Sequence, residues 1–437
     1  MFERVTADDL ASWVPALARV GGDADDAGRI DLLRTLEEIK CAAEAAQARI
    51  TVDFEASQRQ SQADAGLPAR RQGEGIAEQV GLARRQSPHR GSRLLGLAKV
   101  LSTEMPHTFA LMTAGLLSEW RASLLARETA LLTLEQRRSV DAALCRDPQT
   151  LEGLSDAAIV AEAKRLAHRL DPTAAVRRAR RAEAERHVSI RPAPDTMSYV
   201  TALLPVGQGV AVFAALKRAA DQLRATGDDR SRGQIMADTL VTQVTGQAAA
   251  PAVPVEVRLV MTDRTLIHGD REPAVLEGYG VVPAGWARDL ADTAFAQGAL
   301  SLRRLYTAPH TGELIAMDSR ARVAPKGLGS FIDTRDQVCR TPWCGAPIRH
   351  HDHPVPHDAG GRTTATNQQG LCERCNHAKQ APGWRARPSP GARHTIVTTT
   401  PTGHRYTSTA PPPPGAGTTP GARSRLETYA LDLVLAA

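Results

Sequence analysis

The sequence predicts a mainly α protein with a small α+β region and a metal-binding module near its C-terminus. Aromatic residues make up only 4% of the 437 residues, so the core must be built from Ala, Leu and Val, which suits packed helices. Residues 31–56 contain no Pro or Gly and carry Leu32, Leu36 and Ile39 at helical spacing. Four of the six cysteines lie between Cys339 and Cys375, which indicates a separate module.

Helical patterns dominate the first half of the chain. Helices are expected over residues 110–145, 156–170 and 210–246, and two short helices over residues 75–101 with a turn near Gly81. Those two helices resemble a helix-turn-helix. The alternative is that two bundle helices meet there, and it is favoured because Pro88 and Gly91 should interrupt the second helix.

A basic helix is expected after Pro172. Its arginines could form a stripe that binds phosphates, or a solvated face that Glu183 and Glu185 balance, and the second interpretation is favoured. The arginines concerned are Arg177, Arg178, Arg180, Arg181 and Arg186.

Short strands interrupt the helical pattern further along. Residues 187–205 predict two strands around a turn at Pro194 and Asp195, and β-branched residues in 251–262 predict another strand. A loop before a helix at 286–296 and a hairpin in residues 306–317 complete this region.

These patterns divide the chain into five parts. They are an N-terminal segment (1–27), a mainly helical domain (28–250), a small α+β extension (251–330), the metal-binding module (331–390) and a tail rich in Pro, Thr and Gly that ends in a short helix (391–437).

Composition restricts the function less than the motifs do. The net charge of +6 permits a polyanionic partner without requiring one. No export signal and no run of the ~18 apolar residues that a spanning helix needs is visible, so the prediction is a cytoplasmic protein without membrane partners. Cys41 and Cys145 stand alone in helical patterns and are expected to be buried.

The other four cysteines form two close pairs. Cys339 and Cys344 are separated by four residues, Cys372 and Cys375 by two, and 27 residues lie between the pairs. In a cytoplasmic chain such pairs indicate a metal more often than a disulfide. Four thiolates would fill the tetrahedral shell of Zn²⁺ and leave no open position, so the zinc would be structural. The alternative is a set of thiols without metal.

A second set of residues lies between and just after these pairs: Asp352-His353, Gly360-Gly361, Asn367 and Asn376-His377, in that order. With the cysteines, this stretch resembles the ββα-metal site of HNH endonucleases in the zinc-stabilised form. Residues 28–336 are similar to the helical domain of unknown function that often accompanies such modules.

The resemblance implies a role for each residue. His353 would be the general base, Asp352 a ligand of a catalytic Mg²⁺ or Mn²⁺, and Asn367 the brace of the loop that carries His353. Asn376 would be the second ligand, with His377 in reserve, because many relatives have His at the position of Asn376.

The chemistry of these residue types agrees with those roles. A neutral imidazole can accept a proton from water, and a hard cation on oxygen ligands can polarise a phosphate. His351 could replace His353 as the base if the strand register slips, because alternate residues share a face. His350 and His357 are expected to be surface residues near the site.

Residues 331–384 carry six basic and five acidic side chains. Arg362 and Lys379 are the expected phosphate contacts, and Arg385 and Arg387 would extend that surface. Binding of DNA by this segment alone would be weak.

The sequence therefore predicts a metal-dependent HNH endonuclease that hydrolyses DNA. Two alternatives stay open: a catalytically silent, zinc-stabilised nucleic-acid-binding module, and a helical regulatory or interaction protein. The helical domain could also mediate homo-oligomer formation or bind a protein partner.

Overall fold

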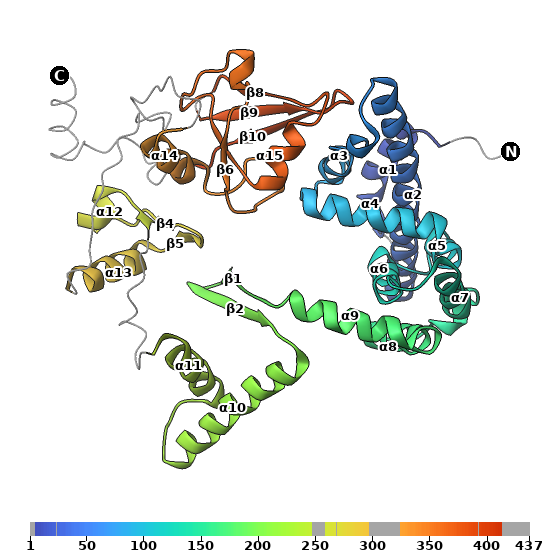
Figure 1. The fold of residues 1–437 in the computed structure, drawn as a ribbon, viewed down its shortest axis with the longest axis horizontal. Helices are drawn as coiled ribbons and strands as arrows, with labels where there is room; N and C mark the ends of the chain where they lie inside the picture. Colours follow the sequence, from blue (N-terminus) through green and yellow to red (C-terminus); the bar gives the residue numbers. More distant parts are fainter. Residues whose placement is uncertain are drawn as a thin grey trace. The chain divides into compact units, whose positions relative to one another are not determined.

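The computed structural model describes residues 5–22, 24–246, 258–267, 269–296, 324–391 and 393–412. The chain forms two compact units, Met1–Arg84 with His89–Arg180, and Arg85–Pro88 with Arg181–Ala437. Within the described parts, helices predominate and the sheets are small, as the sequence predicted (Figure 1). No helix in these ranges is both long and apolar enough to cross a membrane. The predicted hairpin at 306–317 and the predicted terminal helix lie outside the described residues.

The first unit is a helical bundle. Its helices are α1 (Ala7–Leu17), α2 (Asp26–Asp64), α3 (Ile76–Ala83), α4 (Pro88–Thr103), α5 (Pro106–Thr113), α6 (Glu119–Glu128), α7 (Leu134–Cys145), α8 (Asp156–Leu170) and most of α9 (Pro172–Ala184). The core between these helices is built from small and branched apolar side chains such as Ala45, Leu101, Leu125 and Ile159. This confirms the expectation of a core with few aromatic residues.

The packing of α3 against α4 corrects one prediction. Helix α4 begins at Pro88 and continues through Gly91 to Thr103, so neither residue interrupts it. Gly91 lies against α3, where a Cβ would approach the carbonyl oxygen of Ala77 to 2.2 Å. Proline suits the first turn of a helix, and glycine here permits a close helix crossing.

A buried carboxylate organises the segment that was expected to be helical over 110–145. The chain forms α5, α6 and α7 there, and Asp141 of α7 caps the start of α5. Its carboxylate accepts hydrogen bonds from the backbone N–H groups of His107 (2.8 Å) and Thr108 (2.9 Å). The Cys145 thiol is buried beside Thr108, and burial raises its pKa to about 12, so it is unreactive as expected for a core cysteine.

The second unit begins with the hairpin that the sequence predicted. Strands β1 (His187–Ala193) and β2 (Met197–Leu203) pair antiparallel around Pro194 and Asp195. Helices α10 (Val206–Ala225) and α11 (Arg232–Thr245) follow. A small sheet of β3 (Leu259–Val260), β4 (Ala274–Leu276) and β5 (Gly280–Val282) comes next, with α12 (Asp263–Ile267) and α13 (Ala284–Ala296).

The described residues from 324 to 412 are here called the C-terminal module. It contains α14 (Lys326–Asp336), an antiparallel pair of β6 (His350–Asp352) and β7 (Gln369–Leu371), and α15 (Glu373–Lys379). Three further strands, β8 (Arg385–Ser389), β9 (Thr395–Thr399) and β10 (Arg405–Thr409), form an antiparallel sheet with β9 in the centre (Figure 1).

This last sheet corrects the predicted tail. Residues 391–437 were expected to be a Pro/Thr/Gly-rich tail, yet β9 and β10 lie within them. The threonines that suggested a low-complexity tail are β-branched, which favours strands, and Thr395, Thr398 and Thr399 lie in β9 with the buried Ile396. The turn between the two strands uses Pro401 and Gly403. The strands of this segment could not be recognised from its composition alone.

A buried ionic cluster holds the module together. Asp336, at the end of α14, is fully buried and accepts hydrogen bonds from Arg335 Nε (2.7 Å), Arg340 Nη1 (2.9 Å) and the Gly370 N–H of β7 (2.7 Å). Burial alone would raise the pKa of Asp336, but the hydrogen bonds and charges of the two arginines outweigh it and hold that pKa below its usual range. The carboxylate is therefore ionised at neutral pH.

The two arginines extend the cluster to the rest of the module. Arg335 donates to the carbonyl oxygens of Ala365 (2.6 Å) and Gln368 (2.7 Å) before β7. Arg340 donates to the carbonyl oxygen of Ser408 in β10 (2.6 Å). The cluster thus joins α14, β7 and the three-stranded sheet.

We expect Asp336→Asn to destabilise the module by about 3–5 kcal/mol, because it leaves Arg340 buried without a counter-charge. Hydrogen exchange of β7 and β9 in the full chain would measure the loss. The exposed Asp358→Asn is the matched control and should change exchange little. Unchanged protection in Asp336→Asn would contradict the assigned role of the cluster.

His394 makes the stability of the module depend on pH. Burial, and then the charge of Arg335, lower the pKa of His394 to about 4, and its Nε2 lies 2.9 Å from the carbonyl oxygen of Thr366. The unfolded chain binds this proton near pH 6.5, so the stabilisation is complete above pH 6.5 and is lost as the pH falls towards 4. The loss should reach about 3 kcal/mol.

The measurement is hydrogen exchange of β9 and β10 between pH 4 and 7, corrected for intrinsic exchange rates. His394→Gln keeps a donor for Thr366 but does not titrate, and it should flatten the pH dependence. An equally steep dependence in the variant would show that another group is responsible.

Candidate metal centre and neighbouring histidine site

The four cysteines come from two turns. Cys339 and Cys344 lie in the turn between α14 and β6, where the Cys339 N–H donates to the carbonyl oxygen of Ala346 (2.8 Å) and Gly345 has a positive φ of 63°. Cys372 is the N-cap of α15, and its sulfur accepts from the N–H of Cys375 at 3.5 Å. Pairing of β6 with β7 brings the second turn to the first.

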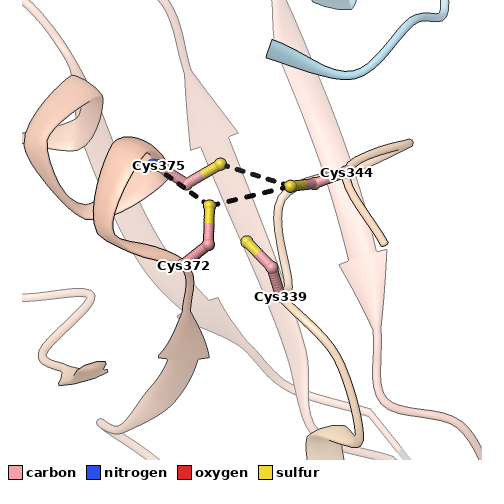
Figure 2. A group of neighbouring side chains, drawn as sticks. All are labelled: Cys339, Cys344, Cys372 and Cys375. Carbon is pink, nitrogen blue, oxygen red and sulfur yellow. Dashed lines mark hydrogen bonds between the residues drawn. The ribbon is translucent and has the colours of Figure 1, made fainter. Parts of the chain in front are cut away.

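The sulfur atoms have the spacing of a tetrahedral metal site. All four Sγ atoms lie within 4.8 Å of one another. Cys344 Sγ is 3.8 Å from Cys372 Sγ and 3.7 Å from Cys375 Sγ (Figure 2). A tetrahedron with Zn–S bonds of 2.3 Å has edges of about 3.8 Å, and a disulfide would need only about 2.05 Å. The prediction that these four cysteines come together is confirmed, and the cluster can hold a structural metal such as zinc.

The electrostatics of the cluster favour a cation. The neighbouring thiols of Cys344 and Cys375 lower the pKa of Cys339, because they can donate to its thiolate. The same sulfur then raises the pKa of Cys344 and of Cys375, because a second thiolate would lie beside the first. A bound divalent cation is what allows several thiolates to coexist at this spacing.

The predicted base lies just beyond the end of β6. The strand ends at Asp352, which pairs with Gln369, and His353 and Pro354 follow it. His353 Nε2 lies 2.9 Å from Thr363 Oγ1 and 2.8 Å from Gln368 Nε2. The imidazole is therefore held by partners from the following loop and from the approach to β7.

The loop after His353 is closed by Asn367. The Asn367 amide oxygen accepts from the Val355 N–H (3.0 Å), and its nitrogen donates to the carbonyl oxygens of Val355 (3.0 Å) and Arg362 (3.0 Å). A Cβ at Gly361 would lie 1.9 Å from the Val355 carbonyl oxygen, and Gly360 has a φ of 85°. The Gly-Gly pair is thus needed for the loop to pass this close to Asn367.

Asp352 is paired with an ammonium group. Its Oδ2 lies 2.8 Å from Lys379 Nζ and accepts a hydrogen bond from Gln369 Nε2 at 3.1 Å. Lys379 also donates to the carbonyl oxygen of His353, and its side chain is only 11% exposed. Lys379 therefore points towards Asp352 and the His353 loop, and its expected role as a phosphate contact stays a prediction.

The two candidates for the second ligand are placed differently. Asn376 is half-buried on α15, which lies against β6 and β7, and its Oδ1 is buried with no hydrogen-bond partner among the described residues. His377 is exposed. A buried acceptor without a donor costs about 1–3 kcal/mol, so the Asn376 oxygen suits a cation or a water molecule.

The remaining histidines and Arg362 lie around this site. His351 Nε2 is 2.8 Å from Asp333 Oδ1 of α14, and a Cβ at Gly329 would meet the His351 ring at 2.9 Å. His351 and His353 thus have different partners. His350, His357 and Arg362 are exposed.

Sequence reasoning missed three residues. Gln368 and Thr363, which contact His353, stand in a run of polar residues with no motif to distinguish them. Asp336 precedes Arg340 by four residues, a spacing that does indicate an ion pair, although it does not reveal that the pair is buried.

Comparison with known proteins identifies the larger part of the chain. Residues 33–336, more than half of the sequence, match the family described as domain of unknown function (DUF222). The chain belongs to this family, in agreement with the similarity noted for residues 28–336. The match ends at Asp336 and does not include the cysteine cluster. No curated protein and no solved structure matches the chain.

We expect the purified protein to hold about one zinc ion per chain at the four cysteines. Cys375→Ser should abolish that zinc and loosen the C-terminal module, because the metal links both turns. Metal analysis by mass spectrometry measures the content. Cys41→Ala removes a buried cysteine outside the cluster and should keep the zinc. Equal zinc in Cys375→Ser and the parent would contradict the assignment.

Proposed function

We propose that the protein is a metal-dependent endonuclease of the HNH type that hydrolyses DNA phosphodiester bonds. The observation that carries the proposal is that Asp352, His353 and Asn376, whose buried oxygen has no hydrogen-bond partner among the described residues, belong to one strand–strand–helix unit beside the cysteine cluster. The order and types of these residues resemble the HNH motif, and this supports the assignment.

His353 is the proposed general base. Its imidazole follows the end of β6, and Thr363 and Gln368 fix the Nε2 side of the ring. Asn367 and Gly361 fix the loop behind it. These partners position the imidazole, which would accept a proton from the attacking water.

Asp352 and Asn376 are the residues that would hold a divalent cation. Carboxylate and amide oxygens are suitable ligands for Mg²⁺ or Mn²⁺. Such a cation polarises a phosphate and stabilises negative charge when it is bound. Asp352 is already paired with the Lys379 ammonium group. A cation bound by Asp352 and Asn376 would therefore have to displace part of the contact between Lys379 and Asp352.

The same ammonium favours a second candidate function, a nucleic-acid-binding module that does not cut. Lys379 Nζ already neutralises Asp352 at 2.8 Å. A protein in which this pair persists would keep the zinc frame as a scaffold and bind DNA without hydrolysing it.

The test is incubation of supercoiled plasmid with the full-length protein and Mg²⁺ or Mn²⁺. The parent should nick or linearise the plasmid, and His353→Ala should be slower by about 10²–10⁴-fold, the usual contribution of a general base. His357→Ala removes an exposed neighbouring imidazole and is the matched control.

The zinc content of all three proteins must be equal for the comparison to hold. Equal cleavage by parent and His353→Ala would reject His353 as the base. Absence of cleavage with every cation, together with binding in a gel shift, would favour the non-cutting module.

A further inference from the structure

The outer face of the β8–β10 sheet is strongly biased in charge. From Arg374 to Leu426 the sequence contains no Asp or Glu and eight Lys or Arg residues. Four of these arginines, Arg385, Arg387, Arg393 and Arg405, lie on or beside the three strands. A solvated face usually mixes both signs, so the absence of acids requires an explanation.

The register places three arginines on one face. Arg385 and Arg405 both pair with Thr399 of the central strand, from opposite sides. Arg387 is two residues from Arg385 and so points to the same side. Ala386, between Arg385 and Arg387, and Ile396 of β9 point to the other side, where they are 6% and 1% exposed. The sheet therefore has an apolar inner face and a basic outer face.

The outer face also carries hydroxyl groups. Ser389, Thr395 and Thr409 occupy one cross-strand row, and Thr407 lies opposite Val397 in the next. Arg385, Arg387 and Arg405 are exposed, and their guanidinium groups have no hydrogen bond or ion pair with another described residue. Their guanidinium groups and these hydroxyls are all potential donors to an anion.

The spacing suits a repeating anion. Arg385 and Arg387 are separated by about 6.8 Å along the strand, and Arg385 and Arg405 by about 9.6 Å across two strand spacings. Charges on edge strands can also serve only to prevent aggregation. Acidic and basic residues could both prevent aggregation. A face with three cations, several hydroxyl groups and no acidic residue is instead complementary to a polyanion.

We propose that this face, formed by Arg385, Arg387 and Arg405 with the neighbouring hydroxyls, binds the phosphate backbone of double-stranded DNA. Arginine binds phosphate oxygens in a bidentate manner, and Ser and Thr hydroxyls are common backbone contacts. The inference rests on the proposed function for its ligand, but it uses none of the residues of the His353 site. It also supplies the affinity that the nearly balanced charge of residues 331–384 does not.

The test is fluorescence anisotropy of a labelled DNA duplex with the full-length protein, in buffer without added divalent cation, over a range of salt concentrations. Replacing the three arginines together by Gln should weaken binding about 10- to 100-fold and reduce the salt slope by about 2.7, that is, 0.9 for each lost phosphate contact. The corresponding triple Lys variant keeps the charges and should retain most of the slope.

The control is Gln at Arg19, Arg49 and Arg146, three exposed arginines of the first unit, with the same change in net charge. Equal losses in the control and the test variant, or an unchanged slope in the test variant, would overturn the proposal. Binding to phosphatidylserine vesicles in place of DNA would overturn it as well.

Cleavage is scored separately. A protein that binds DNA through the three arginines but never cuts it would leave this inference standing and reject the nuclease. A protein that cuts DNA but binds it equally well without the three arginines would support the nuclease and reject this inference.

Discussion

The C-terminal module depends on the burial of Asp336 between Arg335 and Arg340. A carboxylate that is fully removed from water is tolerable only when cations and N–H groups surround it, so α14, β7 and the three-stranded sheet must assemble together. The DUF222 match ends at this residue. The last helix covered by the family is therefore anchored in the fold of the segment that follows it, and a boundary drawn at 336 would cut through the cluster.

The ionic cluster and the cysteine cluster share one short segment. Arg340 lies next to Cys339, so the turn that carries the first cysteine pair is held by the buried carboxylate on one side and is available to a metal on the other. Both clusters also reach β7 or the start of α15, through Gly370 and Cys372. Since β7 pairs with β6, these contacts position the end of β6, where His353 begins its loop. Two sets of buried polar groups thus support the candidate site from outside it.

The basic residues of the module are used in two ways. Lys379 turns inward and neutralises Asp352, whereas Arg385, Arg387 and Arg405 face solvent on a sheet without acids. Lys379 affects how a metal could bind beside His353, because it already pairs with Asp352. The three arginines affect how a polyanion could bind to the surface of the module. The proposed catalytic chemistry and the proposed DNA affinity therefore depend on different residues and can be lost independently.

The sequence by itself determined the features that depend on short spacing. The cysteine pairs, the hairpin around Pro194, the burial of Cys41 and Cys145 and the predominance of helices all follow from neighbours along the chain. Only the tertiary structure decided the inward direction of Lys379, the contact of Gln368 with His353 and the strands in the predicted tail. The first two depend on partners 15 or more residues away along the chain. The strands of the tail pair with nearer neighbours, and the composition of the segment hid them. A polar side chain is directed by whichever buried charge or backbone group needs it, and local pattern does not contain that information.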